Sequence, residues 1–391
     1  MTKEIAKWSD EAMFEAAPID SERGPEVFLL GANPDPLGSI AHAALAYVGD
    51  FRESLAMITD DERRHYLAEI QKTALAMPLE PVNFEFMFRG VTRGFTHQLV
   101  RQRTASYSQE STRFAVKSGV PVGLPPSLQG TNPRAWHENW KEGFNAAIDM
   151  RLGGKDEQLA RQAAPKYAEE YAYKHTSQRN RWRYKWDQMM KGVAEGYNEL
   201  VNDGMPAEDA RGSLPTNLLT QINYNTSLRG LQDHAGLRLC TQAQFEWKQV
   251  WGGIIKAIKD YGKAQTYWVQ IDQKNLMASG TRTRNGHIEQ ELSSAWQFEA
   301  LANIFRPICY KTGKCEFKAD FDRKCSIRNR VDEFAANGVS SENWHIDNYT
   351  IPVKADPVFF SADSMMPNRM TTKSFDAINP AEWLFDPTAA R

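Results

Sequence analysis

Two stretches near the start of the chain have the residue pattern of β-strands. Residues 27–30 form a short apolar run that ends at a Gly-Ala-Asn-Pro turn signal. In the segment 82–88, phenylalanines at 84, 86 and 88 alternate with other residues, which indicates a strand. Between these strands, the Ala-rich segment 39–47 and the segment 60–76, with apolar residues at helical spacing, predict two helices.

The pattern after residue 90 predicts mostly helices and loops. We expect a turn and helix over 90–103, an extended segment over 107–116 and a Pro- and Gly-rich loop over 119–133. Further helices are predicted over most of 135–200, which is rich in aromatic and basic residues, from 207 to 210, and over 225–259. From about residue 280 the pattern weakens, and residues 305–391 are polar and loop-rich.

Composition narrows the class of protein. The 391 residues are 41% hydrophobic and 25% charged, which is ordinary for a globular chain with a sizeable core. The net charge of −2 gives no global attraction to nucleic acid or to an anionic membrane, so an anionic ligand needs locally clustered arginines. The N-terminus lacks an apolar signal segment, no stretch approaches about 18 apolar residues, and four cysteines are few. We therefore expect no membrane span and a cytoplasmic location.

Arginines and amides do cluster between residues 98 and 114. On a helix, Gln98 and Arg101 would share a face, because they are three residues apart. In an extended segment, Gln109, Ser111 and Arg113 would share a face by alternation. Guanidinium, amide and hydroxyl groups together suit a phosphate and the hydrogen-bonding edge of a base. The alternative is a surface helix with solvated arginines.

A longer pattern surrounds this cluster. Its first block reads Phe84-x-Phe86-x-x-Arg89-Gly90-Val91-Thr92-Arg93, then His97-Gln98-Leu99-Val100-Arg101-Gln102-Arg103, seven residues, and Ser111-x-Arg113-Phe114. The second reads Glu208-x-Ala210-Arg211-x-x-Leu214-Pro215, Leu228-Arg229-x-Leu231, Leu237-Arg238 and Ala243-Gln244-x-Glu246. In this order, the blocks resemble the flavin-dependent thymidylate synthases, the ThyX family, whose signature is Arg-His-Arg, seven residues, then Ser.

The resemblance implies an α+β fold with a central sheet and flanking helices. It also implies that the chain is divided into several parts. Residues 1–25 would be a lead-in, 26–117 and 195–280 the catalytic domain, 118–194 a helical insertion, and 281–391 a loop-rich C-terminal extension.

The resemblance further implies two sets of binding residues. The set expected to bind dUMP is Gln98, Arg101, Gln109, Glu110, Ser111, Thr112, Arg113, Arg211 and Arg238. The set expected to bind FAD is Arg101, Gln102, Arg103, Gln109, Ser227, Leu228, Arg229 and Asp233. Arg238 would be catalytic, because a permanently charged guanidinium beside N3 and O2 of uracil stabilises the negative charge that activates C5.

The implied enzyme is a thymidylate synthase that converts dUMP to dTMP. Methylenetetrahydrofolate would supply the carbon, and FAD reduced by NADPH would supply the hydride. The implied assembly is a homotetramer with active sites between subunits. A relative that adds the carbon without reduction would instead make 5-hydroxymethyl-dUMP, which would suit a virus that modifies its DNA. A third alternative is a catalytically silent nucleotide- or nucleic-acid-binding protein.

Departures from the family are concentrated on the flavin side. The usual central histidine of the triplet is Gln102, and the usual asparagine of the late helix is Ser227. A Gly-His-x-Ser/Thr stretch is replaced by residues 74–77, where Met77 cannot hydrogen-bond as a hydroxyl would. Asp233 stands where histidine or asparagine is usual. The nucleotide side is better preserved.

Two further features have a functional and a structural interpretation. Residues 179–186 interleave arginines with aromatics, which could bind single-stranded nucleic acid, but packing of the aromatics on the body is preferred and nucleic acid is not expected. Cys309, Cys315 and Cys325 could ligate zinc with a histidine, but their spacing lacks the usual paired pattern. We therefore expect no metal.

Overall fold

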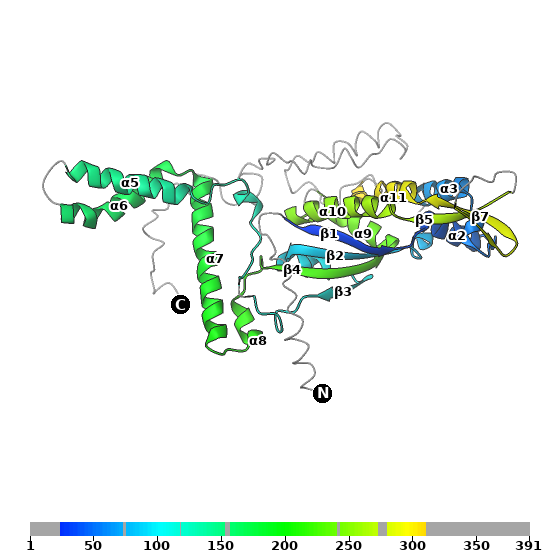
Figure 1. Cartoon of the computed structure of the whole chain (residues 1–391), viewed down its shortest axis with the longest axis horizontal. Helices are drawn as coiled ribbons and strands as arrows, with labels where there is room; N and C mark the ends of the chain where they lie inside the picture. The colour runs from blue at the N-terminus through cyan, green and yellow to red at the C-terminus, as the bar shows by residue number, and fades with distance from the viewer. Residues whose placement is uncertain are drawn as a thin grey trace.

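The described part of the chain is elongated. A computed structural model describes residues 24–72, 76–117, 119–152, 157–240, 243–272 and 280–309. A helical hairpin lies at one end, a four-stranded sheet in the middle, and a three-stranded sheet at the other end (Figure 1).

The central sheet is antiparallel and has the strand order β1-β2-β4-β3. Alternation in β2 turns Phe84, Phe86 and Phe88 into the core, where each is at most 1% exposed. The ring of Tyr224 lies between Phe86 and Tyr107 of the neighbouring strands, at centroid distances of 6.1 and 5.6 Å. The strands are β1 (Glu26–Ala32), β2 (Asn83–Thr92), β3 (Ala105–Gln109) and β4 (Leu219–Ser227).

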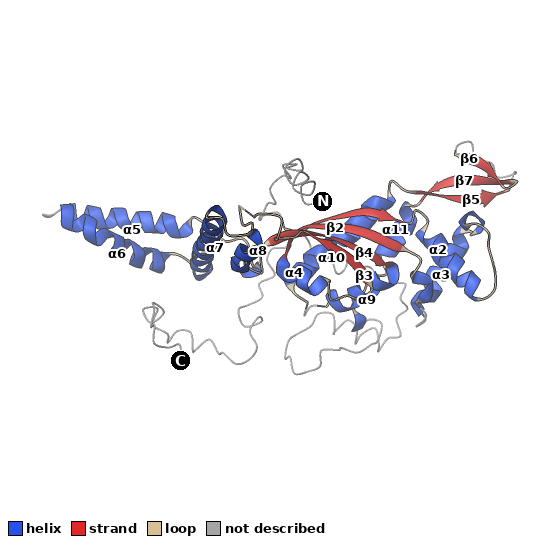
Figure 2. Ribbon diagram, turned by 90° about the horizontal axis from the view of Figure 1, so that it is seen from below, coloured by secondary structure: helices blue, strands red, loops and turns tan. Residues whose placement is uncertain are grey.

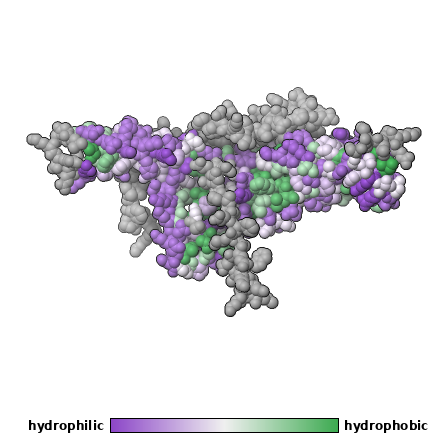
Figure 3. All heavy atoms as spheres, viewed as in Figure 1, coloured by the Kyte–Doolittle hydropathy of each residue, from purple (hydrophilic) through white to green (hydrophobic). Residues whose placement is uncertain are grey.

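Helices cover one face of this sheet. They are α4 (Arg93–Leu99), α9 (Leu228–Arg238) and α10 (Phe245–Gly262), which lie on the same side in Figure 2. Trp247 and Trp251 of α10 enter the core with Phe95 of α4. The opposite face lacks such a cover among the described residues: Phe28 and Leu30 are 45% and 53% exposed, and apolar atoms gather over the strands in Figure 3.

The smaller sheet is joined to the same core. Its strands are β5 (Thr266–Ile271), β7 (His287–Ser293) and β6 (Thr281–Arg284), in the order β5-β7-β6. Next to it lie α2 (Pro36–Tyr47) and α3 (Asp60–Lys72), which are linked by a buried ion pair of 2.5 Å between Asp35 and Arg63. Helix α11 (Ala295–Ala302) packs on α10 and contributes Phe298 to the main core.

The segment between β3 and β4 is helical. Helices α5 (Ala135–Leu152) and α6 (Glu157–His175) form an antiparallel hairpin that projects from the body, and α7 (Gln178–Asn202) runs across its base towards α8 (Ala207–Ala210) (Figure 1). The basic and aromatic run in α7 packs in part. Tyr184 stacks on Trp136 at 4.7 Å, and Arg179 donates to the carbonyls of Ser127 and Gln129, whereas Trp182 is 42% exposed.

The structure corrects two expectations. The predicted helix over 225–259 is two helices, since β4 runs to Ser227 and α9 ends at Arg238 before α10 begins at Phe245; buried threonines in β4 weaken the apolar alternation that identifies a strand. The predicted extended segment 107–116 ends at Gln109, after which the Ala115 N–H donates to the Ser111 carbonyl in a turn.

Candidate functional site

A first group of site residues lies where α4, α9 and α10 meet. The side-chain oxygen of Gln98 accepts hydrogen bonds from Arg238 at 3.2 Å and from Trp247 Nε1 at 3.0 Å. The Gln98 amide nitrogen donates to Gln244 at 2.8 Å. The guanidinium of Arg238 also lies over the Trp247 ring, 5.0 Å from its centroid. Three elements that are distant in sequence therefore fix the position of Arg238.

The charge of Arg238 is not neutralised by any described residue. Its Nε is buried and has no hydrogen-bond partner among the residues that the structure describes. Burial lowers the pKa of Arg238, and the positive charge of Arg101 lowers it further. Neither arginine forms an ion pair with any residue in the described part of the chain. Two nearby guanidinium groups without a carboxylate favour binding of an anion or of a ring on which negative charge develops.

Gln102 joins the arginine triplet to α9. Its amide nitrogen donates to the Gly230 carbonyl at 2.7 Å, and its oxygen accepts from the Tyr224 hydroxyl at 2.7 Å. Burial raises the pKa of Tyr224, which keeps this hydroxyl a donor. Arg101 and Arg103, on either side of Gln102, are exposed. In this chain, Gln102 thus has a positioning role that needs no histidine.

The residues expected to bind FAD include both exposed and buried side chains. Arg101, Arg103, Arg229 and Asp233 present exposed side chains. Ser227 is the N-cap of α9 and accepts from the Gly230 N–H at 3.2 Å. Leu228 is fully buried in the core, so only its backbone could approach a ligand. Arg229 pairs with the carboxylate of Glu80.

A second group of site residues follows β3. Arg93 donates to the Glu110 carbonyl at 3.3 Å and to Thr112 Oγ1 at 3.1 Å. Burial lowers the pKa of Arg93; the carboxylate of Glu110 opposes this lowering, and the charge of Arg211 adds to it. Arg113 pairs with Glu208 at 2.9 Å. This group therefore holds three guanidinium groups close to two carboxylates.

Other expected residues in this group have local partners. Glu110 pairs with Lys117 at 2.5 Å. Gln109 donates to Thr96 Oγ1 at 2.8 Å, and Ser111 Oγ accepts from the Arg113 N–H at 3.3 Å. The expectation that Gln98 and Arg101 share a helical face is wrong, because α4 ends at Leu99. The structure still brings Arg101 towards Arg238, through the turn that follows the helix.

A cleft adjoins the first group. Its volume is about 780 Å³, and it lies between the end of β2, the loop 123–133 and the start of α10. Gln244, the partner of Gln98, lines it together with Thr92 and Glu246. The Glu246 carboxylate accepts from the Thr92 N–H and hydroxyl, both at 2.6 Å, and burial raises its pKa.

Sequence reasoning missed several residues that shape these groups. Arg93 stood within the quoted motif without a role, and its place in that motif was the available signal. Tyr224, His234 and Trp247 gave no signal, because their contacts come from strands and helices that are distant in sequence. His234 lies edge-on to the Trp247 ring at 4.7 Å, and burial, followed by the charge of Arg238, lowers its pKa to about 3.

The described residues contain no cluster of three or more His, Cys, Asp or Glu side chains that could hold a metal ion. Cys309 is partly buried, while Cys315 and Cys325 lie outside the described residues. Across the same residues, we find no helix with the length and apolar character needed to span a membrane.

The structure is an α+β fold that carries two groups of arginines. A family described as thymidylate synthase complementing protein matches residues 28–261, and the chain belongs to this family. This confirms the resemblance drawn from the sequence, and the predicted α+β class is confirmed by the structure.

Individual relatives agree with the family match. The chain is 29% identical to the flavin-dependent thymidylate synthase of Geobacter sulfurreducens, over 60% of this chain and 82% of the relative. It is 30% identical to the enzyme of the same name from Pyrococcus furiosus, over 57% of this chain and 75% of the relative. Among solved structures, thymidylate synthase X from Helicobacter pylori with FAD and dUMP is 19% identical, over 60% of this chain and 92% of that one, with a TM-score of 0.37.

Proposed function

We propose that this protein is a flavin-dependent thymidylate synthase that converts dUMP to dTMP. Family membership and the names of its relatives support the class of reaction. The observation that carries the proposal is the pair Arg101 and Arg238, held without a carboxylate partner among the described residues, with a buried Arg238 Nε free to donate. Such a donor suits a ligand ring that becomes negatively charged during the reaction.

Arg238 is the proposed catalytic residue. C5 of uracil is a weak nucleophile, and stabilising negative charge at N3 and O2 raises its electron density. Gln98 and Trp247 hold the guanidinium in place, so little reorganisation is needed when the charge develops. The adjoining cleft offers amide groups and space for a mostly uncharged heterocycle.

The second group is the proposed site for the nucleotide phosphate. Arg113 and Arg211 are both close to Glu208, and a phosphate dianion would compete with that single carboxylate for two guanidinium groups. Ser111 supplies a hydroxyl beside them. In the proposed homotetramer, this group can face the Arg238 group of a neighbouring subunit.

The residues around α9 fit FAD in their donor chemistry. Arg101, Arg103 and Arg229 offer exposed guanidinium groups for a pyrophosphate, and Gln102 keeps the first two beside α9. When bound, FAD would carry hydride from NADPH to the substrate. In balance, dUMP, methylenetetrahydrofolate, NADPH and a proton give dTMP, tetrahydrofolate and NADP⁺.

Anaerobic turnover of the full chain with dUMP, methylenetetrahydrofolate, NADPH and added FAD tests this proposal. The expected product is dTMP, identified by mass, with one NADPH consumed per product. A product heavier by one oxygen atom, formed without NADPH consumption, would assign hydroxymethylation and contradict the proposal. A colourless protein that neither takes up FAD nor turns over dUMP would favour the silent binder. Arg134 is exposed and immediately precedes α5. Arg134→Ala is therefore the control for activity that is lost during preparation of a variant.

A further inference from the structure

Helix α7 carries an apolar stripe that the other described residues do not fully cover. One side of the helix packs on the body through Ala194, Tyr197 and Val201. An adjacent stripe remains partly open, with Trp182 and Met189 exposed by 42% and 57%. Its members are Trp182, Trp186, Met189, Val193, Gly196 and Leu200, of which Leu200 also packs against the body cluster around Tyr197.

The spacing of this stripe is that of a helix-pairing seam. Its members follow one another by alternating steps of four and three residues. Steps of this kind average 3.5 residues and keep one side of a helix directed at a partner helix. The neighbouring hairpin does not occupy this side, since Tyr184, which stacks on Trp136 of α5, lies on the opposite side of α7.

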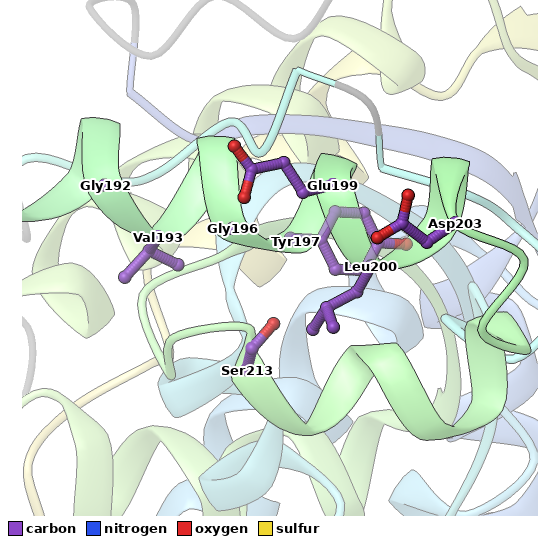
Figure 4. Close-up of a pocket in the computed structure, with 8 residues that line it drawn as sticks. All are labelled: Gly192, Val193, Gly196, Tyr197, Glu199, Leu200, Asp203 and Ser213. Atoms are coloured by element: carbon purple, nitrogen blue, oxygen red, sulfur yellow. The ribbon is translucent and has the colours of Figure 1, made fainter.

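The shape of the stripe changes along the helix. Its first half carries two tryptophans, whereas its second half borders a hollow of about 420 Å³ next to Ser213 (Figure 4). Gly192 and Gly196 form part of the hollow, and a Cβ at either would meet no atom within 4 Å. Pairing two such helices antiparallel places the bulky half of each against the hollow half of the other.

The charges along α7 are also divided between its halves. Residues 179–185 include Arg179, Arg181, Arg183 and Lys185, and residues 195–203 include Glu195, Glu199 and Asp203. Lys185 and Glu199 flank the stripe, are exposed, and have no ion pair among the described residues. An antiparallel partner helix brings opposite charges together, whereas a parallel partner brings like charges together.

We infer that a second copy of this chain docks on α7, with the two α7 helices antiparallel. Trp186 fills the hollow at the partner's Gly196, Met189 meets the partner's Val193, and Lys185 faces the partner's Glu199. The two-fold symmetry of the pairing repeats each contact twice. This inference does not depend on the proposed activity, and it holds for a silent binder as well.

Charge exchange in the full chain tests the pairing. Sedimentation equilibrium should show self-association of the wild type, and Lys185→Glu or Glu199→Lys alone should weaken it by about tenfold, because two attractive pairs become repulsive. The double variant Lys185→Glu/Glu199→Lys restores opposite charges and should recover wild-type association. Lys166→Glu, an exposed lysine on α6, makes the same charge change elsewhere and should have no effect.

Gly196→Phe tests the shape of the seam. The open space at Gly196 allows the variant chain to fold. The added ring fills the hollow and excludes the partner's Trp186. Association should weaken by about tenfold or more, which is typical of the loss of a buried aromatic contact. A monomeric wild type, single charge variants with unchanged association, or a double variant no better than the singles would each overturn the inference. Circular dichroism of each variant establishes that the helices are retained.

Discussion

Replacement of Arg238 by alanine separates catalysis from stability in this structure. On the catalytic side, the change removes the buried guanidinium proposed to stabilise charge on the uracil ring. Loss of one preorganised donor of this kind typically reduces kcat by about 10²–10³, or about 3–4 kcal/mol. We therefore expect Arg238→Ala to lose at least about a hundredfold in dTMP formation, and Arg238→Lys to lose less, because a charge remains.

The expected effect of the same change on stability is small, because opposing terms nearly cancel. The variant loses a hydrogen bond to Gln98 and a cation–π contact with Trp247, together about 2 kcal/mol. It also removes a buried donor without a partner and the repulsion from Arg101, which returns about 1–3 kcal/mol. Gln98 keeps the Trp247 indole as a donor and is not left unsatisfied.

The assay is anaerobic turnover alongside urea unfolding of the same preparations. For Arg238→Ala we expect turnover to fall by at least about a hundredfold. We expect its free energy of unfolding to change by less than about 2 kcal/mol. Turnover close to that of the wild type would refute the catalytic role of Arg238. A loss of stability above about 4 kcal/mol would refute the cancellation of terms. Arg134→Ala should change neither quantity.

Three further predictions concern stability. The folded pKa of His234 is lowered to about 3, below its unfolded value of 6.5, so its stabilising contribution is complete above 6.5 and is lost as pH falls towards 3. Between about pH 6 and 4, His234→Asn should reduce the slope of unfolding free energy by up to about 1.4 kcal/mol per pH unit, measured in urea. Asp35→Ala removes the closest carboxylate from the buried Arg63, which keeps only Asp60 at 3.4 Å, and should cost about 3 kcal/mol in urea unfolding. Glu69→Ala, at an exposed pair, should leave the free energy of unfolding nearly unchanged. Tyr224→Phe removes the hydrogen bond to Gln102 and should cost about 1 kcal/mol in thermal unfolding; no change would show that this bond is not formed in solution.

Sequence pattern alone predicted the parts of the fold with strong local periodicity. The phenylalanines of β2 alternate without interruption, and the structure places them together in the core. Helix α2 was expected from its Ala-rich run. Strand β4 was not recognised, since buried threonines and tyrosine replace the aliphatic residues that mark a central strand. A strand's place in a sheet depends on partners that a local pattern does not contain.

For the candidate site, the sequence determined which residue types were available, and the tertiary structure decided which of them meet. The clustering of arginines near residues 101–113 and the family resemblance can be read along the chain. That Arg238 lies beside Gln98, over Trp247 and near Arg101 cannot, because these contacts span α4, α9 and α10. The charge on a guanidinium is set by its covalent chemistry, but its freedom to act on a ligand depends on burial and on missing counter-charges. Both of these are properties of the folded chain.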